Sequence, residues 1–467
     1  MSSNGHLKAF EFQKQTVFTV EREFNGRALI ANDMGLGKSP TALWFLKRKS
    51  LGETLPCLII CPKIVKNQWR DLIHKMMGLQ PDILETRTPS KDSFGSQIAL
   101  IHWDIIVYWR DWLEAQNYQT IILDECQAAT NPKAKRTRTA TALAKQIPFC
   151  LALSGTPLTN RPIELFPILN CINPKIWHNR NAYAHKYCAP RWTRYGWDFR
   201  GASNVNELHQ RLKQSVMVRY RKDEVEHQLP DKIRTIIPVD LPHYEEYLKA
   251  KKDFVGWLKE KYPERMSKAV KAAALVQAGH LLRLAAKLKL RPVVEWINDR
   301  LLQSDEKLAV FCVHRKCCEA LKRRIKGKSV IINGSVTGKD RDLAIHQFKK
   351  DKNTRTLIGN MAAAGIGLNL TEASTMAIVE LAQKPGPLLQ VEDRLHRIGQ
   401  TKTTWIYYFI GVDTIEEKVA KLVQKKNKII TGTLDGGGED DDSFDLYDLL
   451  LQELDGGISH ETNGSPK

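Results

Sequence analysis

Short apolar runs recur along this chain in two series, and they constrain its fold more than any other feature of the sequence. Each run has three to five residues and is followed by turn residues. Uninterrupted runs of this length are typical of strands buried on both faces of a parallel sheet. Helical patterns lie between them, which favours an α/β architecture. The first series comprises Ala28–Ala31, Leu58–Cys61, Ile121–Leu123 and Leu151–Leu153, and the second Leu308–Cys312, Val330–Ile332, Thr356–Ile358, Met376–Val379 and Ile406–Phe409.

Two such series predict two parallel-sheet lobes with helical insertions. Between them, apolar residues repeat at helical spacing among many lysines, as in Tyr244, Tyr247 and Leu248. The carboxyl-terminal stretch is acidic and of low complexity, a composition typical of disorder. We therefore expect a first lobe with a helical extension at 1–228, a linker and helical brace at 229–300, a second lobe at 301–434 and a disordered tail at 435–467.

The formal net charge is +19, yet residues 435–467 contain ten acidic residues and one lysine, so residues 1–434 carry +28. A basic field of this size attracts polyanions, and nucleic acid is the first partner to consider. The nine cysteines show no C-x-x-C spacing, so we expect buried, reduced thiols and no structural zinc site. No apolar run approaches membrane-spanning length, so we expect a soluble intracellular protein with no membrane partner.

The strongest local signal is the string Asn-Asp-Met-Gly-Leu-Gly-Lys-Ser at 32–39, between an expected strand and an expected helix. Gly35 and Gly37 allow backbone N–H groups to surround a phosphate, and the following helix terminus adds a favourable dipole. In such a loop Lys38 reaches the β- and γ-phosphates and the Ser39 hydroxyl binds Mg²⁺. An ordinary strand–helix turn is the alternative.

Two further strings follow expected strands of the first lobe. Asp124 and Glu125 end the strand Ile121–Leu123, which places two carboxylates at the carboxyl edge of the sheet, where ligands bind. Asp124 suits the Mg²⁺ shell, and Glu125 suits the polarisation of an attacking water. Ser154–Pro157 follows the next strand and places small hydroxyl groups beside both sites, unless it is a simple turn.

The fourth string, Gln390–Gln400, lies in the second lobe and contains two arginines three residues apart, Arg394 and Arg397. This spacing predicts that both lie on one helix face. Such a pair can stabilise charge that develops on a γ-phosphate during transfer. A solvated basic helix face is the alternative for this string in isolation.

In this order and spacing, the strings resemble the Swi/Snf-type ATPases of helicase superfamily two, over about residues 10–430. The resemblance implies RecA-like lobes, ATP with Mg²⁺, and duplex DNA, forked or branched, as the track. It also implies that Gln13 reads adenine and that Gln390 closes on the nucleotide with the arginines. Gly365 and Gly367 would bind the nucleotide as part of a motif that links the sites. The matching strings are Phe12-Gln13, Asn32–Ser39, Cys61-Pro62 with Trp69, Asp124-Glu125, Ser154–Pro157, Val310–Arg315, Ala363–Leu370 and Gln390–Gln400.

The segment Trp192–Asn204 is similar to the distant branch of that family that contains the annealing helicases. Gln127 departs from the family pattern, because a histidine usually stands at this fourth position of the Asp-Glu motif. The departure leaves the carboxylates intact but puts in question how the motif couples to its neighbours. The second lobe lacks the long chromatin-type insertion, and such compact members resemble bacterial and viral versions, so we expect the cytoplasm or nucleoid of a bacterial-type cell and not a nucleus. We also expect a monomer.

The candidate DNA contacts are basic residues near the motifs, namely Lys63, Lys133, Arg136 and Arg315. Phosphate contact and a solvated basic loop are equally compatible with them. The leading hypothesis is a double-stranded DNA translocase that remodels forks, reanneals strands or displaces proteins. The alternatives are an RNA- or DNA-separating helicase and a nucleotide-dependent DNA clamp without turnover. The acidic tail is a candidate site for a protein partner.

Overall fold

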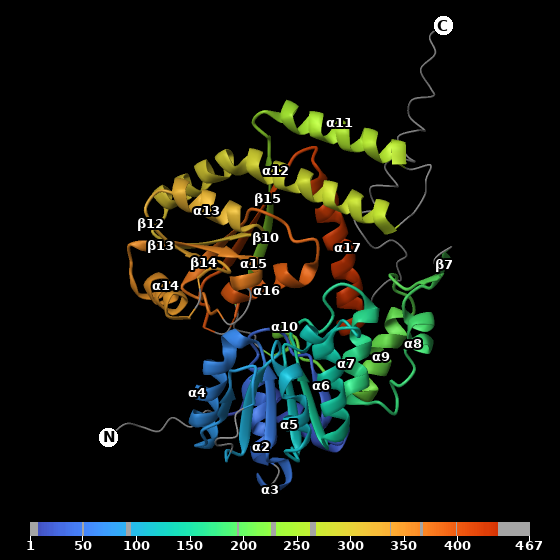
Figure 1. Cartoon of the computed structure of the whole chain (residues 1–467). Helices are drawn as coiled ribbons and strands as arrows, with labels where there is room; N and C mark the ends of the chain where they lie inside the picture. The colour runs from blue at the N-terminus through green and yellow to red at the C-terminus, as the bar shows by residue number, and fades with distance from the viewer. Residues whose placement is uncertain are drawn as a thin grey trace. The chain divides into compact units, whose positions relative to one another are not determined.

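The computed structural model describes residues 8–48, 51–89, 95–193, 196–225, 230–261, 268–336, 338–364, 368–397 and 399–437. The chain divides into two compact units (Figure 1). Unit 1 comprises residues up to 228 together with 428–442, and unit 2 comprises 229–427 together with the remaining tail. We expect a disordered tail from residue 435, but Asp435 is the last residue of a helix and pairs with Arg219. The tail beyond residue 437 lies outside the described residues.

Unit 1 is built on a seven-stranded sheet whose paired strands all run parallel. The strand order is β3-β4-β2-β5-β6-β1-β9. Every residue of β2 is buried, as its unbroken apolar sequence requires. The strands are β1 (Arg27–Ile30), β2 (Cys57–Cys61), β3 (Asp82–Leu84), β4 (Ile98–His102), β5 (Thr120–Asp124), β6 (Phe149–Leu153) and β9 (Met217–Val218).

Helices flank this sheet (Figure 1). Helix α2 contacts both α1 and α4, and helix α6 contacts both α5 and α7. A separate antiparallel hairpin, β7 (Arg191–Thr193) and β8 (Gly196–Asp198), follows α8. The helices are α1 (Glu11–Arg22), α2 (Lys38–Arg48), α3 (Leu51–Thr54), α4 (Lys66–Met77), α5 (Arg110–Glu114), α6 (Lys135–Gln146), α7 (Phe166–Ile172), α8 (Arg180–Tyr187), α9 (Val205–Ser215) and α10 (Lys222–Val225).

Unit 2 is built on a six-stranded parallel sheet of order β10-β15-β14-β11-β13-β12. The strands are β10 (Lys232–Val239), β11 (Lys307–Cys312), β12 (Lys328–Ile332), β13 (Thr354–Asn360), β14 (Ala373–Ile378) and β15 (Thr404–Gly411). The helices are α11 (Tyr244–Lys261), α12 (Lys268–Gln303), α13 (Arg315–Arg324), α14 (Gly338–Lys350), α15 (Met361–Ala364), α16 (Pro385–Leu395) and α17 (Ile415–Asp435).

The prediction of two parallel-sheet lobes with helical insertions is confirmed, and each apolar run of the two series overlaps a strand. One stretch differs from expectation. Residues 232–239, expected in the linker, form β10 at an edge of the second sheet. Four consecutive residues of β10 are exposed, so it lacks the apolar run that marks a strand buried on both faces.

Helix α17 contributes to both units. Ile415, Val419 and Leu422 belong to a buried cluster of unit 2. Ile430 and Leu434 are buried in the main core of unit 1. The end of this helix is therefore part of the first unit, although the helix starts in the second.

Eight of the nine cysteines are buried, Cys317 is partly buried, and all nine are free, as expected for reduced thiols. Within the described ranges, no helix combines the length and the apolar character needed to cross a membrane.

Candidate nucleotide-binding and hydrolysis site

The loop after β1, residues 32–37, is the segment that we predict to bind phosphate, and we call it the phosphate-binding loop. Gly35 and Gly37 adopt φ values of 87° and 68°, where an L side chain would be strained. A Cβ at Gly155 would lie 2.4 Å from Met34 Cγ, so glycine is needed where the two loops meet. Lys38 begins α2, and its Nζ donates to the carbonyl oxygens of Asn32 (2.9 Å) and Asp33 (3.1 Å). The ammonium group is thereby held within the loop, and Ser39 follows it in the first turn of α2.

Gln13, on α1, ties the amino-terminal segment to this loop. Its side chain is buried, and its Nε2 donates to the carbonyl oxygens of Leu36 (3.5 Å) and Gly37 (3.4 Å). Its Oε1 accepts from the backbone N–H of Phe10 at 3.1 Å. The amide therefore supports the phosphate-binding loop, and adenine recognition by Gln13 stays a prediction.

Asp124 and Glu125 lie at the carboxyl end of β5, as the sequence indicates. Trp69 Nε1 donates to Asp124 Oδ2 at 2.8 Å, and the Glu125 N–H donates to Asp124 Oδ1 at 3.1 Å. Burial, followed by the charge of Glu125, raises the pKa of Asp124 to about 7. The Trp69 hydrogen bond and the charge of Lys38 oppose this shift. A buried carboxylate of this kind gains stability from a nearby cation.

Asp124 and Ser39 are the residues that would hold Mg²⁺. Both offer hard oxygen ligands, which this ion prefers. The raised pKa of Asp124 indicates that its negative charge lacks sufficient compensation from the protein, in keeping with a carboxylate that serves a cation. The residues present therefore fit a magnesium–nucleotide complex.

Gln127 connects the carboxylates to the loop at Ser154. Its Nε2 donates to Glu125 Oε2 at 2.6 Å, and its Oε1 accepts from Ser154 Oγ at 2.7 Å. Ser154 Oγ in turn accepts from the backbone N–H of Thr156 at 3.0 Å. The unusual fourth residue of the motif thus provides a direct hydrogen-bonded path between two sequence motifs.

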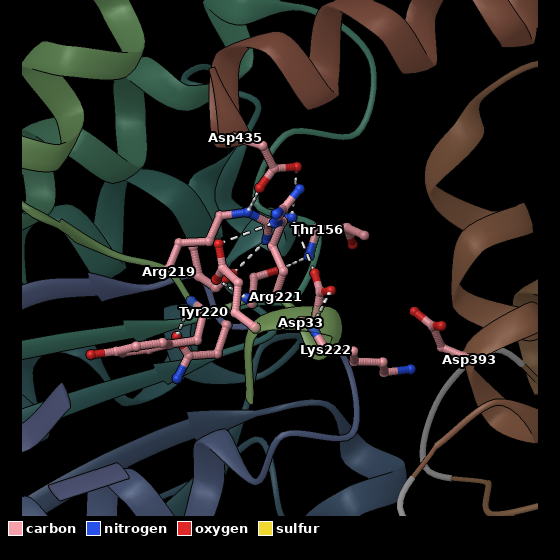
Figure 2. Close-up of polar contacts among 12 residues, drawn as sticks. Asp33, Thr156, Arg219, Tyr220, Arg221, Lys222, Asp393 and Asp435 are labelled. Atoms are coloured by element: carbon pink, nitrogen blue, oxygen red, sulfur yellow. Dashed lines mark hydrogen bonds and ion pairs between the residues drawn. The ribbon is translucent and has the colours of Figure 1, made fainter. Parts of the chain in front are cut away.

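Arg219, which our sequence reasoning missed, supports the phosphate-binding loop from β9. Its guanidinium donates to the carbonyl oxygen of Ala31 at 2.6 Å and forms ion pairs with Asp33 (3.1 Å) and Asp435. Figure 2 shows the two carboxylates on either side of this guanidinium. The backbone N–H of Lys222 also donates to Asp33, at 3.1 Å. The loop is therefore fixed by a segment that lies far from it in sequence.

In unit 2, Arg394 and Arg397 converge on one acceptor. Each donates its Nη1 to the carbonyl oxygen of Leu368, at 3.4 and 3.2 Å respectively. Burial, and then the charge of Arg394, lowers the pKa of Arg397, with Asp393 opposing the shift. Two guanidinium groups held this close form a concentrated positive charge suited to phosphoryl oxygens.

The prediction that both arginines lie on one helix face is wrong. Helix α16 ends at Leu395, so it contains Gln390 and Arg394 but not Arg397. The side-chain amide of Gln400 donates to the carbonyl oxygens of Leu395 (3.2 Å) and Ala373 (2.9 Å). The Gln400 amide thus bonds the Leu395 carbonyl oxygen, which the next turn of a longer helix would have bonded, and the chain leaves the helix there. Gly365 and Gly367 lie outside the described residues.

The candidate DNA contacts are divided between the units. Lys63 and Lys133 are exposed and follow the neighbouring strands β2 and β5. Arg136 is exposed on α6, and its Nη1 lies 3.6 Å from Asp104 Oδ1. Arg315 begins α13 in unit 2 and donates to Glu319 at 2.6 Å. The first three therefore lie on segments that leave the carboxyl edge of the first sheet, and Arg315 belongs to the other unit.

A group of ligand-type side chains, Cys312, Cys317 and Glu380, lies in unit 2 with its ligand atoms within 4.8 Å of one another. The Glu380 carboxylate accepts from the backbone N–H groups of Val313 and His314 and contacts the His314 ring at 2.7 Å. Burial raises the pKa of Cys312 far above its usual value, which disfavours the thiolate that binds metals. The group is therefore better explained as packing around a satisfied carboxylate.

Comparison with known families matches two models. The SNF2-related domain matches residues 12–288, and the helicase conserved C-terminal domain matches residues 289–399. The boundary between the matches falls within α12, so the first match extends beyond unit 1 into the helical part of unit 2.

Two curated relatives cover most of the chain. One is the SWI/SNF-related matrix-associated actin-dependent regulator of chromatin subfamily A-like protein 1 of Xenopus laevis, 32% identical over 90% of this chain and 43% of the relative. The other is the human DNA annealing helicase and endonuclease ZRANB3, 31% identical over 92% of this chain and 41% of the relative. The chain thus spans less than half the length of either.

Among solved structures, the Sulfolobus solfataricus SWI2/SNF2 ATPase core in complex with dsDNA aligns at 21% identity with a TM-score of 0.44. The alignment covers 94% of this chain and 98% of the other.

Proposed function

Because the chain belongs to the SNF2-related family of helicase-like ATPases, we propose that it is an ATP-driven translocase on double-stranded DNA. The translocation remodels DNA structures such as forks, reanneals strands or displaces bound proteins. The observation that carries this proposal is the gathering of Lys38, Asp124 and Glu125 around one loop and sheet edge. The convergent arginines of unit 2 supply the complementary charge.

Each residue has a defined chemical part in the proposed hydrolysis. Lys38 binds the β- and γ-phosphates, and Ser39 with Asp124 holds Mg²⁺, which when bound neutralises charge on the phosphates. Glu125 orients and polarises the attacking water. Gln127 fixes one oxygen of that carboxylate and leaves the other for the water. Asp124 stays fixed by Trp69, so the two carboxylates keep separate tasks.

The second unit completes the reaction in this proposal. Arg394 and Arg397 stabilise the charge that develops on the γ-phosphoryl group, a contribution of about 10³–10⁵ in rate where such arginines have been removed. Gln390 closes on the nucleotide with them. Since these groups and Lys38 come from different units, hydrolysis requires both units and is coupled to their movement.

DNA binding rests on charge and on the basic residues near the motifs. Residues 1–434 carry a net charge of +28, and Lys63, Lys133, Arg136 and Arg315 contact the phosphate backbone. Phosphate contacts carry no sequence information, so binding is independent of base sequence and weakens steeply with salt. One relative is named a DNA annealing helicase, which supports the reannealing of strands, and we propose forked or branched DNA as the working substrate.

The test is an ATPase assay of the full chain with duplex DNA, single-stranded DNA and RNA in parallel. We expect duplex DNA to give the greatest stimulation. Lys38→Ala and Glu125→Gln abolish turnover, whereas Lys14→Ala, an exposed lysine on α1 paired with Glu11, leaves it unchanged. Retained turnover in either site variant would refute the site assignment. Greatest stimulation by RNA, or DNA binding without any turnover, would refute the translocase.

A further inference from the structure

The β7–β8 hairpin exposes two tryptophans on a small, separate sheet. Trp192 and Trp197 face each other across the hairpin register. Trp192 is 70% exposed and Trp197 is 49% exposed. These are unusually open positions for such large aromatic side chains, and large exposed apolar groups in a cluster mark an interaction site.

Trp197 has a structural role, and Trp192 packs against it. Trp197 packs against His185 of α8 (ring centroids 4.5 Å apart) and stacks with Phe199 (6.3 Å). Phe199 packs against the main core of unit 1. The Trp192 ring contacts Trp197 edge-on at 5.3 Å. The hairpin therefore anchors through Trp197, and Trp192 remains presented at the outer end of an aromatic column.

The surroundings of the column are basic. Arg191 precedes Trp192 on the same strand, and Arg180 and Lys186 are exposed on α8, the helix whose His185 contacts Trp197. Of these cations, Lys186 pairs with Glu207 at 2.9 Å. The acidic residue of the hairpin, Asp198, forms an ion pair with Arg200 at 2.5 Å. An aromatic face surrounded by basic residues suits a nucleobase whose flanking phosphates lie on the cations. An apolar protein partner would gain nothing from this charge.

We propose that the β7–β8 hairpin is a second DNA-binding site, at which Trp192 stacks on an unpaired base of forked or branched DNA. Stacking on the Trp192 ring does not depend on the identity of the base, because every base has a π face. Paired bases inside a duplex have no free face to offer, so the site selects single-stranded arms and junctions. This inference rests on the proposed function on DNA. It adds a binding site for the unpaired arms of a fork, which a fully paired duplex does not have.

The test compares DNA binding by the full chain to a fork with two unpaired arms and to a fully paired duplex of equal length. Trp192→Ala weakens fork binding by about tenfold and leaves duplex binding and duplex-stimulated ATPase within about twofold. Trp192→Phe, which retains an aromatic face, restores most of the fork affinity. Trp192→Leu retains an apolar side chain without a π face and behaves as the alanine variant does.

The control is Tyr108→Ala, which removes another aromatic side chain of unit 1 that is 51% exposed and changes neither affinity. A 2-aminopurine base in an unpaired arm is quenched by the native chain and by Trp192→Phe, but not by Trp192→Ala. Unchanged fork binding in Trp192→Ala, or an equal loss on fork and duplex, would overturn the stacking site. Failure of the native chain to bind any DNA would instead refute the proposed function.

Discussion

Arg219 and Asp435 form an ion pair that fixes the end of α17 to the phosphate-binding loop (Figure 2). Both side chains are largely buried, at 12% and 13% exposure. Burial opposes charge on Arg219, but the Asp435 hydrogen bond and the charge of Asp33 outweigh it and raise the pKa of Arg219. The contact therefore connects the last described helix to a loop residue that precedes Lys38 by five positions.

Asp435→Asn removes this charge while preserving the size of the side chain. We expect the free energy of unfolding to fall by about 2 kcal/mol, below the 3–5 kcal/mol typical of a fully broken buried pair, because Arg219 retains Asp33. The apparent KM for ATP rises, since Asp33 loses part of its support. Urea unfolding and ATP titration of the full chain measure the two effects.

The matched control for this variant is Asp71→Asn, which removes a carboxylate that pairs with Arg70 at an exposed position. Exposed pairs contribute little, so its unfolding free energy stays within about 0.5 kcal/mol of the native value. An Asp435→Asn variant as stable as this control would contradict a structural role for the pair.

Lys289 forms a buried ionic junction inside unit 2. Its side chain is fully buried, and its Nζ donates to Glu416 Oε2 (2.6 Å) and to the carbonyl oxygen of Phe409 (2.7 Å). Lys289→Met leaves the Glu416 carboxylate buried without its cation, which we expect to cost about 3–5 kcal/mol of unfolding free energy. The double variant Lys289→Met with Glu416→Gln recovers part of this loss. Urea unfolding measures all three proteins, and a double variant no more stable than Lys289→Met would contradict the junction.

The sequence was sufficient for most of the buried strands and for the local motifs, because both are written in consecutive residues. The buried strand β4 was not among the predicted runs. Strand β10 escaped prediction because it is an exposed edge strand that contains a proline, Pro238, and has no unbroken apolar run. Strand β9 has only two residues and gives no pattern.

The supports of the site were harder to predict than its chemical groups. Arg219 is separated from Asp435 by 216 positions, and no spacing rule links such residues. Gln127 did give a signal, as a departure from the family pattern, but its hydrogen bonds to Glu125 and Ser154 depend on how two neighbouring strands end. Long-range contacts of this kind require the folded structure.

Lys418, on α17, is a site of pH-dependent stability. Burial, together with the charges of Lys251 on α11 and Lys421, lowers the pKa of Lys418 to about 8. The folded state therefore holds this proton less tightly than the unfolded state, whose lysine titrates near its usual value of about 10.4. The charged Lys418 therefore lowers the free energy of unfolding below about pH 8. This loss disappears as the pH rises from 8 toward about 10.4, above which the lysine is neutral in both states.

Lys418→Gln removes that titration. We expect the variant to melt at a higher temperature than the native chain at pH 7, and the difference between the two to shrink as the pH approaches 10. Taking the difference between variant and native chain cancels the other groups that titrate in this range. A difference that stays constant from pH 7 to 10 would contradict the shifted lysine.

Gln127 offers the sharpest test of how the hydrolysis site is connected. Gln127→Ala removes the hydrogen bonds to Glu125 Oε2 and Ser154 Oγ, so the Glu125 carboxylate loses its orientation and the Ser154 loop loses its link. We expect kcat for DNA-stimulated hydrolysis to fall by about 10- to 100-fold, as is common when a partner that orients a catalytic group is removed. The KM for ATP changes little, because Lys38 and Ser39 remain in place. Gln127→His, which installs the residue usual in the family, restores most of kcat. A Gln127→Ala variant with native kcat would show that the hydrogen-bonded path between the two motifs does not contribute to catalysis.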